Sequence, residues 1–233
     1  MTMTSSYRQF CPVAMAAEIL SKRWTLLVLR ELIAGSTRFN DLRRGVPRMS
    51  PTLLSARLKE LEAAGILRML PDSAGPGLNE YHLTESGRDL SAVIEAVGVW
   101  GQRWIEADLS LDNLDPALLM WDMRRNLNTS PLPDSRSVIN FIYSDLPDSQ
   151  KNWWLIVEPT GSVDLCYIDP GFEVDLFVTT DLRSMTAIWL GLSTVRKAVA
   201  EDRVNLDGDQ AISSHMQQWL GLSHFAGEAR RVG

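Results

Sequence analysis

The chain has 233 residues, of which 45% are hydrophobic and 22% are charged, a composition typical of a globular protein rather than a disordered or fibrous one. Its apolar runs are far shorter than the roughly 20 residues of a membrane-spanning helix, and its first residues lack the pattern of a secretory signal. Two cysteines cannot form a disulfide framework, so we expect a cytoplasmic protein with no membrane partner.

The net charge of −6 is unevenly distributed along the chain. Residues 1–105 contain 13 Lys and Arg against 10 Asp and Glu, whereas residues 106–233 contain 10 against 19. Within residues 35–59 the only acidic residue is Asp41, and the cations are Arg38, Arg43, Arg44, Arg48, Arg57 and Lys59. Such a cluster is typical of a surface that meets a polyanion, and a solvated charged face is the alternative.

Residues 13–20, 24–33 and 40–44 are compatible with helices and predict three short ones. Residues 66–70 and 81–83 predict two strands, which are separated by a tip rich in turn-forming residues at 71–77. After the helices, this strand–loop–strand pattern predicts the wing of a winged-helix domain.

The segment from Ser50 to Gly65 carries the strongest local signals of a helix. Ser50 is a good N-cap, Pro51 suits the first helical position, and Gly65 suits the position after the helix. At about 100° per residue, Leu54, Leu58 and Leu61 fall on one face. The opposite face carries small or polar residues, namely Thr52, Ser55, Ala56, Lys59 and Ala63. Small side chains allow close approach to a major groove, where hydroxyl groups and Lys can reach bases and phosphates.

Thr84 is expected to cap one long helix with a wide apolar stripe. The stripe consists of Leu90, Val93, Ile94, Val97, Trp100 and Trp104. Burial against a partner subunit and burial within the domain are both compatible with this pattern.

An ordered set of motifs in residues 10–104 resembles the HxlR-type bacterial transcriptional regulators. The motifs are Cys11-Pro12-Val13, Lys22–Leu32, Arg38–Leu42, Ser50–Leu61, Ala64–Arg68 and Tyr81–Gly87. The resemblance implies a winged helix-turn-helix homodimer that binds an inverted repeat in double-stranded DNA. The residues expected at the DNA are Arg38, Arg43, Arg44, Arg48, Ser50, Thr52, Ser55, Ala56, Arg57 and Lys59. The wing tip contains Asp72 and lacks the Arg that is frequent in the family, which argues against its insertion into the minor groove.

Residues 113–225 predict an α+β arrangement. Asp115 and Pro116 begin a helix, and Asp181 is expected to cap another. The predicted strands are 138–143, 153–158, 163–168 and 174–179, and a last helix is expected to carry Ile212, Met216, Trp219 and Leu220.

Residues 174–182, 188–191 and 204–209, together with Ala198, resemble the sterol-carrier-protein-2-like fold over about 50 residues. The resemblance implies an α/β sandwich, a sheet with helices that enclose a pocket for lipids or other apolar molecules. The candidate lining residues are Met120, Trp121, Phe177, Met185, Trp189 and Trp219. Ordinary core packing is the alternative for each of them.

Cys11 occupies the position of a cysteine that is common in HxlR-type regulators, and some of these proteins use it to sense oxidants or electrophiles. A packed, inert cysteine is the alternative. The three histidines have no metal-ligand spacing, and the sequence has no phosphate-binding loop or nucleophile elbow. We therefore expect no metal, no cofactor and no enzymatic activity.

The sequence thus predicts an α+β protein with a winged helix-turn-helix domain at 1–105, a linker at 106–112 and a ligand-binding domain at 113–233. We expect a bacterial transcriptional repressor that binds operator DNA as a homodimer and is modulated by an apolar effector. One alternative is a regulator that senses oxidants or electrophiles through Cys11. The other is a lipid-binding carrier that has lost DNA binding.

Overall fold

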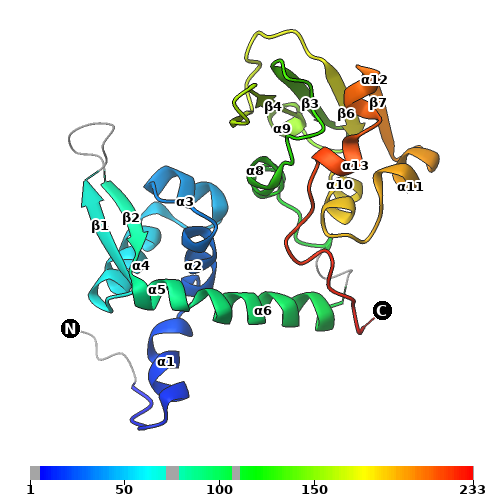
Figure 1. Ribbon diagram of the computed structural model, residues 1–233. Helices are drawn as coiled ribbons and strands as arrows, with labels where there is room; N and C mark the ends of the chain where they lie inside the picture. Colours follow the sequence, from blue (N-terminus) through cyan, green and yellow to red (C-terminus); the bar gives the residue numbers. More distant parts are fainter. Residues whose placement is uncertain (1–5, 72–78, 107–110, 233) are drawn as a thin grey trace. The chain divides into compact units, whose positions relative to one another are not determined.

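The computed structural model describes residues 6–71, 79–106 and 111–232. The chain divides into two compact units, Met1–Gly98 and Val99–Gly233 (Figure 1). Each unit contains a hydrophobic core. Among the described residues, no helix combines the length and the apolar character that a bilayer crossing requires.

The division between the units falls inside helix α6 (Ser91–Trp104). The sequence predicted a linker at 106–112 between the two domains. Residues 107–110, the greater part of that linker, lie outside the described residues, so the linker stays a prediction.

The first unit contains short helices followed by a two-stranded sheet and further helices, as the sequence predicted. The elements are α1 (Pro12–Leu20), α2 (Thr25–Ile33), α3 (Phe39–Gly45), α4 (Pro51–Ala63), β1 (Leu67–Pro71), β2 (Asn79–Leu83) and α5 (Glu85–Asp89), followed by α6. The bounds of α1 to α4 agree with the predicted ones within one residue.

Helix α4 begins and ends at the residues that its local signals indicate. The Ser50 hydroxyl oxygen accepts a hydrogen bond from the Leu53 N–H at 3.3 Å, which satisfies one of the unpaired donors of the first turn. Pro51 takes the first helical position, where its missing N–H costs nothing. Gly65 follows the helix with a φ of +70°, in the left-handed region that glycine adopts without strain.

Strands β1 and β2 pair antiparallel, with Leu67 opposite Leu83 and Pro71 opposite Asn79. The residues between them, 72–78, contain the predicted wing tip with Asp72 and lie outside the described residues. An additional bridge between Arg38 and Glu80 joins the segment before α3 to β2.

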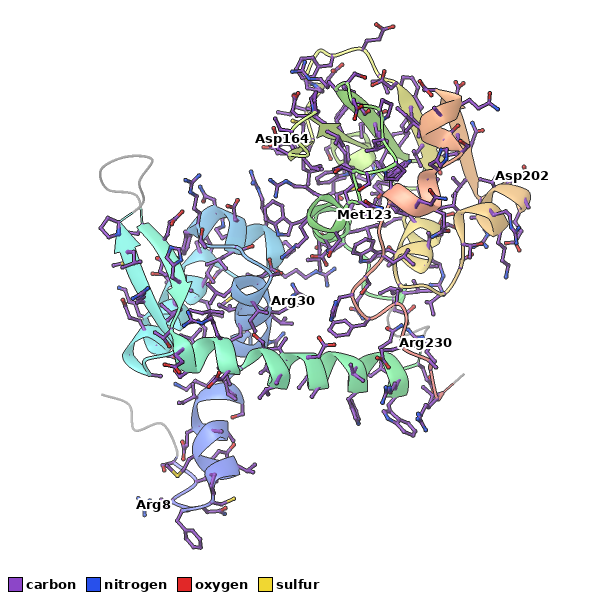
Figure 2. All side chains as sticks on the ribbon, viewed as in Figure 1. Arg8, Arg30, Met123, Asp164, Asp202 and Arg230 are labelled. Carbon is purple, nitrogen blue, oxygen red and sulfur yellow. The ribbon has the colours of Figure 1, made fainter. Side chains whose placement is uncertain are left out.

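A charged pair connects α2 to the end of α3. The Arg30 side chain, labelled in Figure 2, donates from Nη2 to the Glu31 carboxylate at 2.8 Å and to the Gly45 carbonyl at 2.8 Å. The Glu31 side chain is 1% exposed. Gly45 has no room for a side chain, because a Cβ would lie 1.9 Å from Glu31 Cδ. These contacts fix the end of α3, from which the chain turns into α4.

The prediction of one long helix after Thr84 is wrong. Thr84 caps α5, which ends at Asp89, and α6 begins at Ser91. At the break the Leu90 N–H donates to the carbonyl of Gly87, three residues back, instead of four. Gly87 is buried against the Ile66 carbonyl. The spacing of apolar residues along the helix could not predict this contact, because Ile66 is distant in the sequence.

The second unit contains helices and strands in an α+β order. The elements are α8 (Pro116–Asn126), β3 (Ser137–Tyr143), α9 (Asp148–Lys151), β4 (Asn152–Val157), β5 (Val163–Cys166), β6 (Leu176–Thr180), α10 (Leu182–Trp189), α11 (Val195–Ala200), β7 (Val204–Gly208), α12 (Gln210–Ser213) and α13 (Met216–Trp219). Asp115 and Asp181 cap α8 and α10 as expected, each accepting a backbone N–H three residues on.

The strands of the second unit form one mixed sheet in the order β5-β4-β3-β6-β7. The β3–β6 pair is parallel, and the other pairs are antiparallel. One face of the sheet packs on α8, α10 and α13 (Figure 1), through core residues that include Phe141, Leu155, Met123, Met185 and Trp219.

The predicted last helix with Ile212, Met216, Trp219 and Leu220 is wrong as a single element, because the structure divides it into α12 and α13. The Trp219 ring Nε1 donates to the Ile212 carbonyl at 2.8 Å, so this carbonyl at the end of α12 bonds to a side chain. The periodic apolar positions are nevertheless buried on one side.

Candidate nucleic-acid interface

Helix α4 presents two different faces. Leu54, Leu58 and Leu61 are at most 1% exposed and belong to the core of the first unit. Thr52 and Ala56 are exposed, as is Lys59, and Ser55 is partly buried. The structure therefore places the short and hydroxyl-bearing side outward, as the helical spacing predicted.

The predicted cations of α3 and of the segments on either side of it are exposed, and some are held by acidic neighbours. Arg38 Nε lies 3.7 Å from Glu80 Oε1, and Arg44 Nη1 lies 3.1 Å from Asp41 Oδ1. Exposed pairs of this kind contribute at most about 1 kcal/mol, so their guanidinium groups can exchange a carboxylate for a phosphate. Arg43 and Arg48 are exposed on α3 and on the turn that follows it.

The side chains of Arg43 and Lys59 make no hydrogen bond or ion pair with the described residues. Ser50 is exposed, but its hydroxyl group caps α4. The structure thus assigns Ser50 a structural role, and a DNA contact by this residue stays a prediction.

Arg57 differs from the other predicted DNA contacts. Its side chain is 11% exposed and forms an ion pair with Glu60, and it lines a cavity together with Lys22 and Thr25. The structure therefore separates Arg57 from the exposed side of α4. Lys22, Thr25 and Glu60 were not predicted, because Lys22 and Glu60 are 38 residues apart and no local pattern connects them.

The candidate ligand-binding residues of the second unit fall into two groups. Met120, Trp121, Met185, Trp189 and Trp219 are at most 5% exposed. Phe177 is 38% exposed, on the opposite side of β6 from the buried Leu176 and Val178. The structure therefore does not bring Phe177 together with the other five.

Close packing surrounds the buried members of this set. Met120, Met185, Trp189 and Trp219 belong to one core cluster, and the Tyr143 hydroxyl lies 3.1 Å from Met120 Sδ. Burial raises the pKa of the Tyr143 phenol well above its usual value. Trp121 is covered by guanidinium groups, with Arg124 Cζ 4.9 Å and Arg125 Cζ 5.5 Å from the ring centre.

Cys11 is exposed and immediately precedes α1. The backbone N–H groups of Ala14 and Val13, in the first turn of α1, lower the pKa of its thiol below the usual value. Cys166 is partly buried at the end of β5.

Comparisons with known proteins match the first part of the chain. Residues 19–109 match the model of the HxlR-like helix-turn-helix family. The HTH-type transcriptional regulator YvaP of Bacillus subtilis is 37% identical over 101 residues, which cover 42% of this chain and 92% of YvaP. The regulator Mb3122 of Mycobacterium bovis is 45% identical over 95 residues, which cover 40% of this chain and 58% of Mb3122.

Among solved structures, the redox regulator HypR in its reduced form is similar, with 33% identity. The match covers 40% of this chain and 91% of HypR, with a TM-score of 0.37. The family assignment rests on the match to YvaP, which covers 92% of that protein, and on the match to the family model. The chain belongs to the HxlR-like helix-turn-helix family of DNA-binding transcriptional regulators.

Proposed function

We propose that the protein is a bacterial repressor that inserts α4 into the major groove of an inverted-repeat operator. The observation that carries this proposal is the exposed side of α4, where Thr52, Ala56 and Lys59 lie outward above a buried row of leucines. A major groove admits an α-helix, and small side chains let the helix axis approach the bases. The cations of α3 and the following turn supply the phosphate contacts that position such a helix.

The operator is bound by a homodimer in this proposal. Helix α6 leaves Val93, Val97, Trp100 and Trp104 between 41% and 59% exposed. A row of large apolar side chains on one helix is a typical protein–protein contact surface. Pairing two copies through it would present two α4 helices, and half-sites on one side of DNA lie about 34 Å apart.

The second unit receives the effector in this proposal. Its mixed sheet covered by helices supports the resemblance to the sterol-carrier-protein-2-like fold. Its large apolar side chains are closely packed, so in this proposal they move apart to admit a lipid or another apolar molecule. An effector acts by binding better to one arrangement of the dimer than to another. If the two arrangements differ in operator affinity, the effector changes operator binding and the operator changes effector binding by the same free energy. The protein has no enzymatic role in this proposal.

Fluorescence anisotropy with the DNA upstream of the protein's own gene tests the proposal. Binding to an inverted repeat, with two protomers per site, is the expected result. Absence of binding at low salt would contradict it and favour the lipid-binding carrier. Native mass spectrometry of protein purified from its host reports the stoichiometry and any apolar molecule that copurifies.

Replacing Arg43 by Gln should weaken operator binding and reduce its dependence on salt. Arg43 is exposed on α3 and makes no ion pair with the described residues, so its charge is available to a phosphate. The slope of log K against log salt should become less steep by about 0.9 for one lost phosphate contact. Lys197→Gln removes an exposed cation of the second unit and should leave the slope unchanged. Equal slopes for Arg43→Gln and the native protein would exclude this contact.

A second candidate function, oxidant sensing, is favoured by the exposure and the lowered thiol pKa of Cys11. A thiolate reduces hydrogen peroxide to water and becomes a sulfenic acid. Peroxide should then change operator affinity in the native protein and in Cys166→Ser, but not in Cys11→Ser. A peroxide response that persists in Cys11→Ser would remove this candidate.

A further inference from the structure

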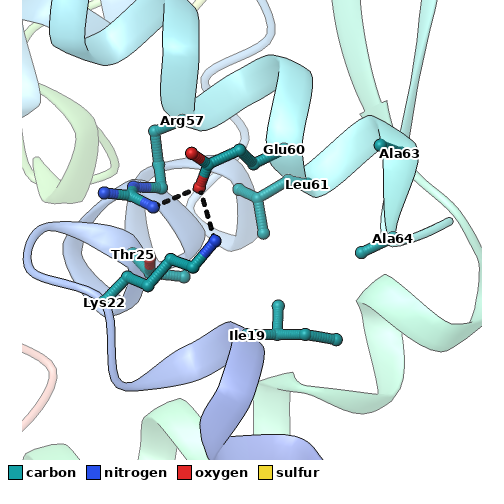
Figure 3. Close-up of a pocket in the computed structure, with 8 residues that line it drawn as sticks. All are labelled: Ile19, Lys22, Thr25, Arg57, Glu60, Leu61, Ala63 and Ala64. Carbon is teal, nitrogen blue, oxygen red and sulfur yellow. Dashed lines mark hydrogen bonds and ion pairs between the residues drawn. The ribbon is translucent and has the colours of Figure 1, made fainter. Parts of the chain in front are cut away.

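A cavity of about 340 Å³ lies within the first unit, between the turn that joins α1 to α2 and the C-terminal half of α4 (Figure 3). It is lined by Ile19, Lys22, Thr25, Arg57, Glu60, Leu61, Ala63 and Ala64. Sites for small molecules have volumes of about 300–1,000 Å³, so this cavity suits a small ligand.

The charged groups at the cavity carry a surplus of positive charge. Lys22 Nζ lies 3.1 Å from Glu60 Oε2, and Arg57 Nη1 donates to the same oxygen (Figure 3). Two cations therefore share one carboxylate. A second carboxylate would neutralise the remaining charge, whereas a cation would be repelled.

Two residues that line the cavity, Thr25 and Arg57, each have a buried polar atom without a hydrogen-bond partner among the described residues. Thr25 is 1% exposed, and its hydroxyl oxygen has no hydrogen bond to any described residue. Arg57 Nε is also buried without a partner among the described residues. Buried polar groups without partners are rare in native structures because they lose their hydration. Both groups can donate to a carboxylate oxygen.

The rest of the lining is apolar and comes from Ile19, Leu61, Ala63 and Ala64. We propose that the cavity binds a small monocarboxylate with an apolar body. Its carboxylate shares Lys22 and Arg57 with Glu60 and accepts a hydrogen bond from the Thr25 hydroxyl group, and its body lies against the apolar side chains. Glu60 is 47% exposed at its side chain and can move toward solvent to admit the ligand.

This site differs from the effector site proposed for the second unit, and occupancy by a carboxylate can act on α4 directly. The Lys22–Glu60 ion pair joins α4 to the turn before α2, so a ligand that rearranges it changes how α4 is held. The effect on DNA rests on the proposed function, whereas the binding of the carboxylate does not.

Benzoate and benzamide, which have nearly the same shape but differ in charge, test the site by calorimetric titration of the full chain without DNA. Benzoate should bind at least about tenfold more tightly than benzamide, a difference of about 1.4 kcal/mol. Thr25→Val keeps the shape of the side chain and removes the hydroxyl group, and Lys22→Gln removes one cation. Each should weaken benzoate binding several-fold, while Lys197→Gln, which removes an exposed cation on α11, should not.

Equal affinities for the two probes, absence of saturable benzoate binding, or native affinity in both Thr25→Val and Lys22→Gln would overturn the inference. Thermal unfolding of each variant shows whether it is folded. If Lys22→Gln is not folded, the benzoate affinity of Thr25→Val alone tests the inference. Operator binding is measured separately. Loss of benzoate binding with intact operator binding would refute only this site, and the reverse result would refute only the proposed function.

Discussion

Replacing Gly87 by alanine should destabilise the first unit by about 2–4 kcal/mol, because the new methyl group would collide with backbone. A Cβ at this position would lie 2.1 Å from the Ile66 carbonyl oxygen and 3.2 Å from its carbon. A flexible side chain could move aside, but this carbonyl is fixed. It accepts hydrogen bonds from the Thr84 N–H and the Thr84 hydroxyl group, both at 3.0 Å, and moving it would weaken both.

Hydrogen exchange at the amides of β1 and β2 measures this effect, because it reports the opening free energy of the first unit separately from the second. Gly101→Ala is the matched control. Gly101 lies within α6, and a Cβ there would meet only Ile105 Cδ1 at an ordinary 3.8 Å. Alanine at a helix interior is favourable by up to about 1 kcal/mol over glycine, so this variant should be as stable as the native protein or more so. Native protection of β1 and β2 in Gly87→Ala would show that α5 and Ile66 are not in close contact.

The success and failure of the sequence predictions in the first unit have physical causes. Helix α4 was predictable because its cap at Ser50, its proline at the first position and its glycine after the last turn are local signals. The break between α5 and α6 was not, because it depends on the contact of Gly87 with a carbonyl 21 residues earlier in the chain. Local signals determine where such helices begin, and tertiary contacts determine where this one is interrupted.

In the candidate DNA interface, too, local spacing predicted some features and tertiary contacts determined the others. The burial of Leu54 and the exposure of Thr52 follow from helical spacing. Arg57 was grouped with the DNA contacts on charge alone, although five steps of about 100° place it roughly 140° from Thr52, beside the leucines. The helical angle of Arg57 therefore indicated that it lies apart from Thr52. The cavity that Arg57 shares with Glu60 could not be predicted in this way, because its other wall is the turn at Lys22.

The second unit was predictable in four of its strands, but its fifth described strand, β7, was not predicted, and neither was the packing of the unit's interior. Alternation along β6 correctly placed Leu176 and Val178 on one face and Phe177 on the other. Assigning Phe177 to the ligand site together with Trp219 disregarded this alternation. The parallel pairing of β3 with β6 joins segments far apart in the chain, and no local pattern of the sequence specifies it.

Replacing Ala56 by glutamate should abolish specific operator binding while the protein stays folded. Ala56 is exposed in the middle of the outward side of α4, between Thr52 and Lys59. A glutamate there is longer than the groove contact allows and brings a carboxylate toward phosphates. Glutamate is a good helix former, and the position is not part of the core, so stability should change by less than about 0.5 kcal/mol.

The expected loss in operator affinity is at least about 100-fold, which corresponds to about 2.7 kcal/mol. Ala200→Glu makes the same change in net charge at an exposed position of α11 and should bind the operator like the native protein. A comparable loss in both variants would trace the effect to overall charge, which acts through the long-range field of the protein. Native affinity in Ala56→Glu would mean that this side of α4 does not face the bases, and the DNA would then have to contact another surface of the first unit.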